Sequence, residues 1–319
     1  MIKKLANWPE HERADPADWI QAVLSWGQTK KVTDFYFLPA EGGNYQVRAQ
    51  ILGQVRTLAV MEADFGKRAL AIIKYRAGLN LAENRRPQLG RFDFGQGFVR
   101  VSTVGDFLGQ ESAVLRLIYP DLSQNRWFEP AIFADLVAEK ISAGLYLVAG
   151  PTGSGKTSTL YRLLDAWSPD KVVLTVEDPV EIYQPAFLQL QVNEQAGIDY
   201  QSLIKVALRH RPDLLVIGEI RDAKTAQAAL QAALAGHLVL STLHANSELA
   251  VFDRLLNLGL DRQLLNQALV KTVYQRLLPD LDGQLGVVCG VANWQAGEVT
   301  HHRPYAENLK CYQQGNQEV

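Results

Sequence analysis

One segment of eight residues constrains this 319-residue chain more than any other part of it. Gly150-Pro-Thr-Gly-Ser-Gly-Lys156-Thr157 fits the phosphate-binding pattern G-x-x-x-x-G-K-[ST], known as the P-loop. The apolar run 145–149 before it predicts a strand, and apolar residues at helical spacing after it predict a helix. These are Leu160, Leu163, Leu164 and Trp167. A strand, a loop and a helix in this order predict a nucleotide-binding α/β domain.

The residue types in this loop suit a phosphate cradle. Glycines let backbone N–H groups turn inward without Cβ clashes, and the start of the following helix adds partial positive charge. We expect Lys156 to reach the β- and γ-phosphates of ATP, and the Thr157 hydroxyl to ligate Mg²⁺. The predicted nucleotide-binding set is Gly150, Pro151, Thr152, Gly153, Ser154, Gly155, Lys156, Thr157 and Ser158. The alternative is a glycine-rich turn that binds no ligand.

Short apolar runs alternate with helix-like sequence in the C-terminal part of the chain. The runs are 145–149, 172–176, 214–217 and 238–243. Each run is apolar on both faces, which is typical of parallel strands buried in an α/β sheet. We therefore predict an α/β domain over 131–319, in which the tail after Gly286 is polar and weakly patterned.

The N-terminal part has a different pattern. Helical periodicity covers 16–26 and about 63–77. Strand-like runs cover 32–38, 45–51, 55–58, 91–94, 97–104 and 113–118. This pattern predicts a small α+β domain over 1–120 with a mostly antiparallel sheet. The polar stretch 121–130 is the predicted linker.

Acidic residues follow two of the predicted buried strands. Glu219 ends the run 214–219, and Glu177, Asp178 and Glu181 follow the run 172–176. Ligands of open α/β sheets bind beyond the carboxyl ends of the strands, where these acids are expected to lie. A carboxylate near the γ-phosphate can orient water and metal. The alternatives are that Glu219 caps a helix or pairs with Arg221, and that the other acids form an ordinary turn.

Two histidines flank the predicted strand 238–243. His237 precedes this strand and His244 follows it. His244 is the better-placed candidate because it lies at the same sheet edge as the P-loop. Each histidine can instead be an ordinary hydrogen-bonding residue.

Composition excludes several classes of protein. Lys plus Arg is 32 and Asp plus Glu is 34, so the net charge is −2 and bulk-charge binding of nucleic acid is not expected. Cys289 and Cys311 are the only cysteines, which excludes a four-cysteine zinc site. The sequence has neither a signal-peptide pattern nor a run of about 20 apolar residues, so we expect a cytoplasmic protein.

Four motifs taken together resemble the secretion ATPases, the motors of type II secretion and type IV pilus assembly. They are the P-loop, Thr175-Val-Glu-Asp-Pro-Val-Glu181, Arg211-Pro-Asp-Leu-Leu-Val-Ile-Gly-Glu-Ile-Arg-Asp222 and Gly236-His-Leu-Val-Leu-Ser-Thr-Leu-His-Ala-Asn246. In that family these are the Walker A, Asp box, Walker B and His box. The resemblance implies a PAS-like domain followed by a RecA-like P-loop ATPase domain, in a homo-oligomer that is a hexameric ring.

The resemblance also implies roles for individual residues. Glu219 is the implied Walker B carboxylate and a partner of Mg²⁺, with Glu177 and Glu181 near metal and water. Asp178 has a supporting place, His244 senses the γ-phosphate, and His237 supports the same strand. The N-terminal stretches Val99-Arg-Val-Ser-Thr103 and Val114-Leu-Arg-Leu-Ile118 match a region that supplies arginines to the nucleotide. We therefore nominate Arg100 and Arg116, although both could simply form salt bridges on a sheet surface.

The length and the missing zinc module narrow the resemblance further. A short assembly motor without zinc most resembles the ATPase of Gram-positive competence systems, which build a pseudopilus for DNA uptake. The implied cofactors are ATP and Mg²⁺, and the implied partner is a polytopic inner-membrane platform protein that recruits the ATPase to the cell membrane. The alternatives are a pilus retraction ATPase, a type II secretion motor, and a nucleotide-gated scaffold with little hydrolysis.

Overall fold

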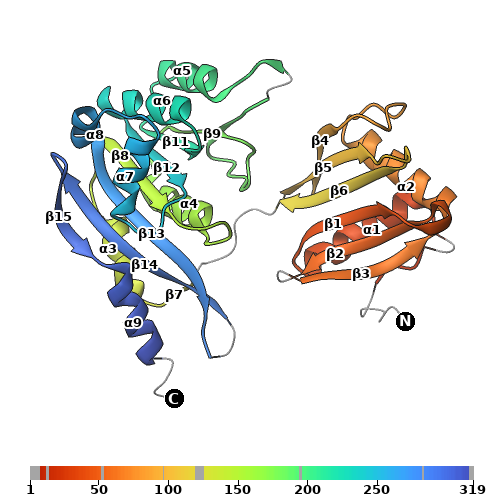
Figure 1. The fold of residues 1–319 in the computed structure, drawn as a ribbon. Coiled ribbons are helices and arrows are strands. Elements are labelled where there is room, and N and C mark those ends of the chain that lie inside the picture. The colour runs from red at the N-terminus through yellow and green to blue at the C-terminus, as the bar shows by residue number, and fades with distance from the viewer. Residues whose placement is uncertain are drawn as a thin grey trace. The chain divides into compact units, whose positions relative to one another are not determined.

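The structure is a computed structural model that describes residues 8–11, 14–51, 54–95, 97–118, 126–193, 196–281 and 284–315. The chain divides into two compact units, Met1–Pro120 and Asp121–Val319. Figure 1 shows the first unit in red to yellow-orange and the second in yellow-green to blue. Of the predicted linker, residues 121–125 lie outside the described ranges, whereas Arg126–Trp127 forms a short strand, β7, and Pro130 begins a helix.

A six-stranded antiparallel sheet forms the centre of the first unit. Its strands lie in the order β3-β2-β1-β6-β5-β4. Their bounds are Val32–Pro39 (β1), Tyr45–Ile51 (β2), Gln54–Met61 (β3), Gln88–Phe94 (β4), Gly97–Gly105 (β5) and Glu111–Ile118 (β6). Every pair in this sheet is antiparallel, as the alternating sequence pattern predicts.

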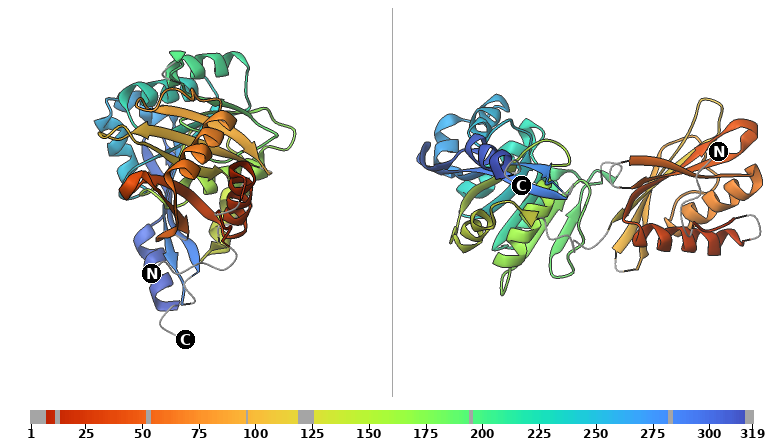
Figure 2. Two further views of the ribbon diagram at one scale, coloured as in Figure 1. Left: turned by 90° about the vertical axis from the view of Figure 1, so that its right-hand side faces the viewer. Right: turned by 90° about the horizontal axis from the view of Figure 1, so that it is seen from below.

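Two helices cover one face of this sheet (Figure 2). They are α1 (Pro16–Thr29) and α2 (Ala63–Arg76), and a single 3-10 turn, η1 (Glu41–Gly43), joins β1 to β2. The Asp15 side chain accepts from the Ala17 N–H and caps α1, with Pro16 in the first turn. The buried core includes the aromatic residues Trp19, Phe35 and Phe37. The first unit is thus a small α+β domain with its own core.

The second unit contains a nine-stranded sheet with mixed direction. The main path has the order β10-β9-β11-β12-β8-β13-β14-β15, and β7 pairs with β14. The bounds are Gly144–Ala149 (β8), Val173–Glu177 (β9), Leu188–Gln191 (β10), Leu214–Glu219 (β11), Leu238–Leu243 (β12), Leu269–Pro279 (β13), Leu285–Gln295 (β14) and Glu298–Arg303 (β15). From β10 to β13 neighbouring strands are parallel, and the β13–β14 and β14–β15 pairs are antiparallel.

Helices cover both faces of this sheet. The bounds are Pro130–Ala138 (α3), Lys156–Trp167 (α4), Tyr200–Arg209 (α5), Ala223–Leu234 (α6), Ala250–Asn257 (α7), Arg262–Ala268 (α8) and Tyr305–Gly315 (α9). One core joins α5 to α8 to one face, and a second core joins α3 and α4 to the other. Successive side chains of β8 pack into opposite cores. Leu145 and Leu147 belong to the first core, and Tyr146 and Val148 belong to the second. The predicted buried parallel strands are confirmed.

The region after Gly286 differs from the prediction. We expected a weakly patterned tail, but the structure places the long strand β14 beside β13, followed by β15 and α9. Residues 287–292 of β14 are buried on both faces, and α9 packs against this strand. The expectation was wrong because glycine, cysteine, alanine and valine follow one another in this run without regular alternation, so its strand pattern is weak although its residues are buried in the sheet.

Candidate functional site

The P-loop lies between β8 and α4, and its shape depends on a strand far away in the sequence. Gly150 has φ +152°, and a Cβ there would lie 2.4 Å from the backbone oxygen of Gln275 in β13. The Gln275 side-chain Nε2 also donates to the Ser154 carbonyl over 2.6 Å. Glycine is therefore required at position 150, because the loop runs directly against β13.

Lys156 holds the loop from inside. Its Nζ donates to the carbonyl oxygens of Gly150 and Pro151, each over 3.0 Å. Burial lowers the pKa of Lys156, and the nearby carboxylates of Glu219 and Glu181 act in the opposite direction. The ammonium group therefore lies in the curve of the loop, at the N-terminus of α4, where an anionic group gains most from both charges.

Glu219 reaches the same space because of an irregularity in β11. The pairing of β11 with β12 shifts register between Ile217 and Glu219, which makes Gly218 the bulged residue. A Cβ on Gly218 would lie 3.3 Å from the Glu177 Cα, so only glycine leaves the neighbouring strand undisturbed. The Thr242 hydroxyl donates to the Gly218 carbonyl over 2.8 Å. The bulge directs the Glu219 side chain into the cavity.

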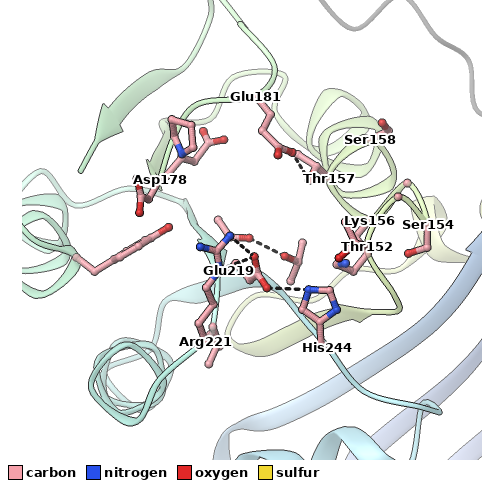
Figure 3. A pocket seen from close by; sticks show the side chains of 18 of the residues that line it. Thr152, Ser154, Lys156, Thr157, Ser158, Asp178, Glu181, Glu219, Arg221 and His244 are labelled. Carbon is pink, nitrogen blue, oxygen red and sulfur yellow. Dashed lines mark hydrogen bonds and ion pairs between the residues drawn. The ribbon is translucent and has the colours of Figure 1, made fainter. Parts of the chain in front are cut away.

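Two basic side chains hold the Glu219 carboxylate (Figure 3). Arg221 donates to Oε2 through Nε and Nη2, each over 2.8 Å, and Nε2 of His244 lies 3.1 Å from Oε1. The sequence left open whether Glu219 pairs with Arg221 or lies at the nucleotide site. The structure shows the pairing with Arg221, and the paired carboxylate also lines the cavity beside the P-loop.

Glu181 lies across the cavity, beside the start of α4. The Thr157 hydroxyl donates to its Oε2 over 2.9 Å (Figure 3). Asp178 lines the same cavity from the β9 side. The Thr157 hydroxyl, which we expect to ligate Mg²⁺, donates its hydrogen to this carboxylate, and the lone pairs of its oxygen stay available to a metal ion.

Glu177 is buried, with 3% of its surface exposed. Its Oε1 accepts from the hydroxyls of Thr175 and Tyr161 over 2.6 and 2.7 Å, and more weakly from Gln189 Nε2 over 3.4 Å. Burial raises the pKa of Glu177, and these donors lower it. Glu177 also lines the cavity, so it connects the cavity to a buried polar network.

These side chains surround one cavity of about 660 Å³. It is lined by Thr152, Gly153, Ser154, Gly155, Lys156, Thr157, Ser158, Glu177, Asp178, Pro179, Glu181, Tyr200, Gly218, Glu219, Ile220, Arg221, Thr242, His244, Arg254 and Leu277. The sequence analysis did not nominate Tyr200 or Arg254. Both come from helices, α5 and α7, whose positions over the sheet edge follow from tertiary packing and have no local signal.

The cavity suits a triphosphate and its Mg²⁺. A lysine and a helix N-terminus supply positive charge, and hydroxyl and carboxylate groups suit a hard cation. The Ser154 Oγ, which belongs to the loop, is buried without a hydrogen-bond partner among the residues that the structure describes. An unpartnered polar atom at this place is available to a ligand.

His237 lies away from this cavity. It precedes β12, and its Nδ1 is 3.3 Å from the Pro212 carbonyl oxygen, at the opposite end of the strand from His244. Its expected role in supporting the strand stays a prediction, and it rests on this contact alone.

The nominated arginines lie side by side in the first unit. Arg100 of β5 faces Arg116 of β6 across the strand pair, and Arg91 of β4 faces Arg100 in the same row. Asp34 of β1 is the next residue in the row, and its Oδ1 accepts from Arg116 Nε over 2.7 Å. The sequence analysis missed Arg91, although strand alternation across the 91–100 hairpin places it on the same face.

The fold and the cavity together define a P-loop ATPase. The phosphate loop follows β8 in the parallel part of the sheet, and the strands β9 and β11 carry carboxylates at the same edge. No helix in the described ranges is long and apolar enough to cross a membrane.

The chain belongs to the type II/IV secretion system protein family, whose model matches residues 13–318. Competence protein ComGA of Streptococcus pneumoniae is 42% identical over 265 residues, which cover 81% of this chain and 83% of that protein. The type IV pilus assembly ATPase PilB of Thermus thermophilus is 35% identical over 82% of this chain. These matches confirm the resemblance to secretion and pilus ATPases and to a competence protein.

The relatives differ in length. This chain spans only 30% of the Thermus PilB protein and 64% of the putative type II secretion system protein E of Escherichia coli, which is 36% identical over 93% of this chain. Among solved structures, the pilus retraction motor PilT with bound ADP has a TM-score of 0.72 at 24% identity and covers 94% of this chain and 88% of its own. The Legionella pneumophila ATPase DotB has a TM-score of 0.70 at 19% identity, covering 98% of this chain and 90% of its own. These two likenesses confirm the predicted α/β P-loop fold.

Proposed function

We propose that this protein is a cytoplasmic, hexameric ATPase that hydrolyses ATP to power assembly of a competence pseudopilus for DNA uptake. The single observation that carries the proposal is the cavity at the P-loop, where Lys156, Glu219 and His244 come together. The 42% identity to a competence protein, over most of both chains, supports the choice of machine.

The side chains divide the work of hydrolysis. Lys156 exchanges its two loop carbonyls for the β- and γ-phosphates of ATP, and the Ser154 hydroxyl is available to the same ligand. Glu219 orients the attacking water. His244 senses whether the γ-phosphate is present and passes this on to Glu219 through their contact. Thr157 and Glu219 are the proposed partners of Mg²⁺, which neutralises charge on the transferring phosphoryl group when it is bound.

The proposed motor acts on a membrane partner. ATP binding and hydrolysis close and reopen the protein, and this motion drives a polytopic platform protein at the inner membrane to assemble pilin-like subunits. Arg100 and Arg116 are proposed to act on nucleotide bound by a neighbouring subunit of the ring. The net charge of −2 fits a motor that leaves DNA contact to other proteins.

The decisive experiment measures phosphate release. Purified oligomer given ATP and Mg²⁺, with and without membranes that contain its platform partner, is expected to release inorganic phosphate. Lys156→Ala should abolish the release and ATP binding, whereas the exposed Lys171→Ala should behave as wild type. Wild-type protein that binds ATP without releasing phosphate in either condition would favour the scaffold alternative over the motor.

A type II secretion motor is the second candidate. The Escherichia coli relative named for that system matches 93% of this chain, more than the competence relative does. Deletion of the gene separates the two. Loss of transformation with normal protein secretion supports the competence motor, and the reverse result supports the secretion motor.

A further inference from the structure

The buried network around Glu177 joins three elements of the second unit. Three side chains donate to the same carboxylate oxygen, Oε1. Thr175 belongs to β9, the strand that carries Glu177, but Tyr161 belongs to α4 and Gln189 to β10. The acid is therefore fixed by the phosphate-loop helix on one side and by the edge strand of the sheet on the other.

Tyr161 joins the P-loop helix to this acid. It lies one turn after Thr157, its side chain is 2% exposed, and its ring packs against Phe187 with centroids 6.1 Å apart. The hydroxyl donates to Glu177 over 2.7 Å and accepts from Gln189 Nε2 over 2.7 Å. Because both bonds of this hydroxyl lie within the network, its orientation is fixed before any ligand binds.

Gln189 uses its whole amide group. Besides Tyr161, its Nε2 donates to the Ile182 carbonyl over 2.8 Å, and its Oε1 accepts from the Gln184 N–H over 2.9 Å. Ile182 directly follows Glu181, the acid that accepts from Thr157. One side chain therefore clamps the loop behind Glu181 and also supports the tyrosine that holds Glu177.

The electrostatics of Glu177 explain why such support is needed. Burial raises the pKa of this carboxyl, and the charge of Glu181 acts in the same direction, whereas Thr175, Tyr161 and Gln189 oppose the shift by donating hydrogen bonds. Ionisable groups near Glu177 include Tyr161 on α4, Glu181 on the loop and Tyr200 on α5, and Lys156, Arg221 and Arg254 line the same cavity. The hydrogen bonds to the Glu177 carboxylate come from neutral donors, which stabilise its charged form.

We propose that Tyr161 and Gln189 are positioning residues of the hydrolytic site, which hold Glu177 by one oxygen and fix the backbone behind Glu181. They keep both acids in place relative to Thr157, whose hydroxyl can donate to Glu181 and ligate the metal ion through its oxygen at the same time. The inference rests on the proposed ATPase function, and it adds two side chains outside the cavity lining to the machinery of that site.

The test removes one oxygen atom. Tyr161→Phe keeps the ring and its packing but deletes the hydroxyl, and we expect kcat for ATP hydrolysis by the intact oligomer to fall about tenfold, with the Kd for ADP changed less than about twofold. The matched control is Tyr146→Phe, because the Tyr146 hydroxyl in β8 is buried without a hydrogen-bond partner within the described part of the chain. This control should keep the wild-type kcat. Gln189→Met provides a second variant, with an expected loss of similar size.

A double variant separates positioning from general damage. If Tyr161 acts through Glu177, then Tyr161→Phe adds no further loss of kcat to Glu177→Gln, whereas independent structural effects multiply. In Tyr161→Phe the loss of a donor also raises the pKa of Glu177, so the acid limb of the pH profile of kcat should move to higher pH. Unchanged kcat in Tyr161→Phe, or losses that multiply, would overturn this inference alone. A wild-type oligomer without hydrolysis would overturn the proposed function with it.

Discussion

Glu219 and His244 contact each other across neighbouring strands, with 3.1 Å between Oε1 and Nε2. Glu219 ends β11 and His244 follows β12, so the contact joins two motifs that lie 25 positions apart in the sequence. Arg221 holds the other carboxylate oxygen. An acid held on both sides has a defined orientation, and any ligand that competes for His244 or Arg221 changes the surroundings of Glu219 at once.

Glu219→Gln is expected to separate binding from turnover. The amide keeps the shape of the side chain but cannot take a proton from water, so ATP hydrolysis should fall by roughly 10² to 10⁴ while ATP affinity stays within a few fold. Phosphate release and equilibrium binding of ATP measure the two effects. Glu298→Gln, an exposed acid on β15, is the matched control and should retain activity. Wild-type hydrolysis by Glu219→Gln would transfer the role to Glu177 or Glu181.

Arg116→Ala tests the proposed action of this arginine between subunits. Turnover by the assembled oligomer should fall by about 10³ or more, with little change in ATP affinity, because arginines of this kind stabilise the charge of the transferring phosphoryl group. Arg116 also pairs with buried Asp34, so loss of fold has to be separated from loss of function. Asp34→Asn breaks the same ion pair and leaves the arginine in place. Equal losses in both variants would contradict the catalytic role.

The ion pair between Lys74 and Glu111 is expected to control the stability of the first unit. Lys74 Nζ lies 2.8 Å from Glu111 Oε1, and the two side chains are 2% and 10% exposed. Lys74 Nζ also donates to the Glu83 carbonyl oxygen over 2.8 Å. Lys74→Met leaves Glu111 buried without its partner, and we expect a loss of about 3–5 kcal/mol in the free energy of unfolding. Urea denaturation measures it.

The control for this substitution is Lys67→Met, which changes an exposed lysine on the same helix and should cost less than about 0.5 kcal/mol. The double variant Lys74→Met/Glu111→Leu should recover part of the loss, because it removes the unpaired charge. A loss from Lys74→Met as small as that from Lys67→Met would show that the buried pair is dispensable.

The two thiols are expected to react at very different rates. Burial raises the pKa of Cys289 to about 12, so this thiol stays protonated at pH 8 and is a poor nucleophile. Cys311 is exposed on α9. A thiol-specific reagent at pH 8 should modify one group per chain quickly and the second only after unfolding. Cys311→Ser should remove the fast phase, and a fast phase that persists would show that Cys289 is accessible.

Local sequence patterns were sufficient to predict the helices and strands whose apolar residues recur at regular spacing. The P-loop, the parallel strands β8, β9, β11 and β12, and the antiparallel character of the first sheet all follow from residue spacing, because buried strands and amphipathic helices leave period-specific traces. The acids at the ends of β9 and β11 were found for the same reason, since the carboxyl ends of parallel strands share one edge.

Features that depend on distant contacts had no such trace. Strand β14 is a run of small and β-branched residues without clear alternation, and only its position between β13 and β15 buries it. Tyr161 fits the apolar face of α4 and gives no sign of its hydrogen bond to Glu177. Arg254 enters the cavity lining because of the place of α7 over the sheet. The spacing of residues along one helix or strand carries no information on these features, because each of them depends on contacts between different elements.

The support of the P-loop by Gln275 has a consequence for biosynthesis. The hydrogen bond from Gln275 to the Ser154 carbonyl joins residues 121 positions apart. A chain growing on the ribosome therefore makes the phosphate cradle long before it makes the strand that braces it. The complete cradle, including this hydrogen bond, therefore exists only after β13 has joined the sheet.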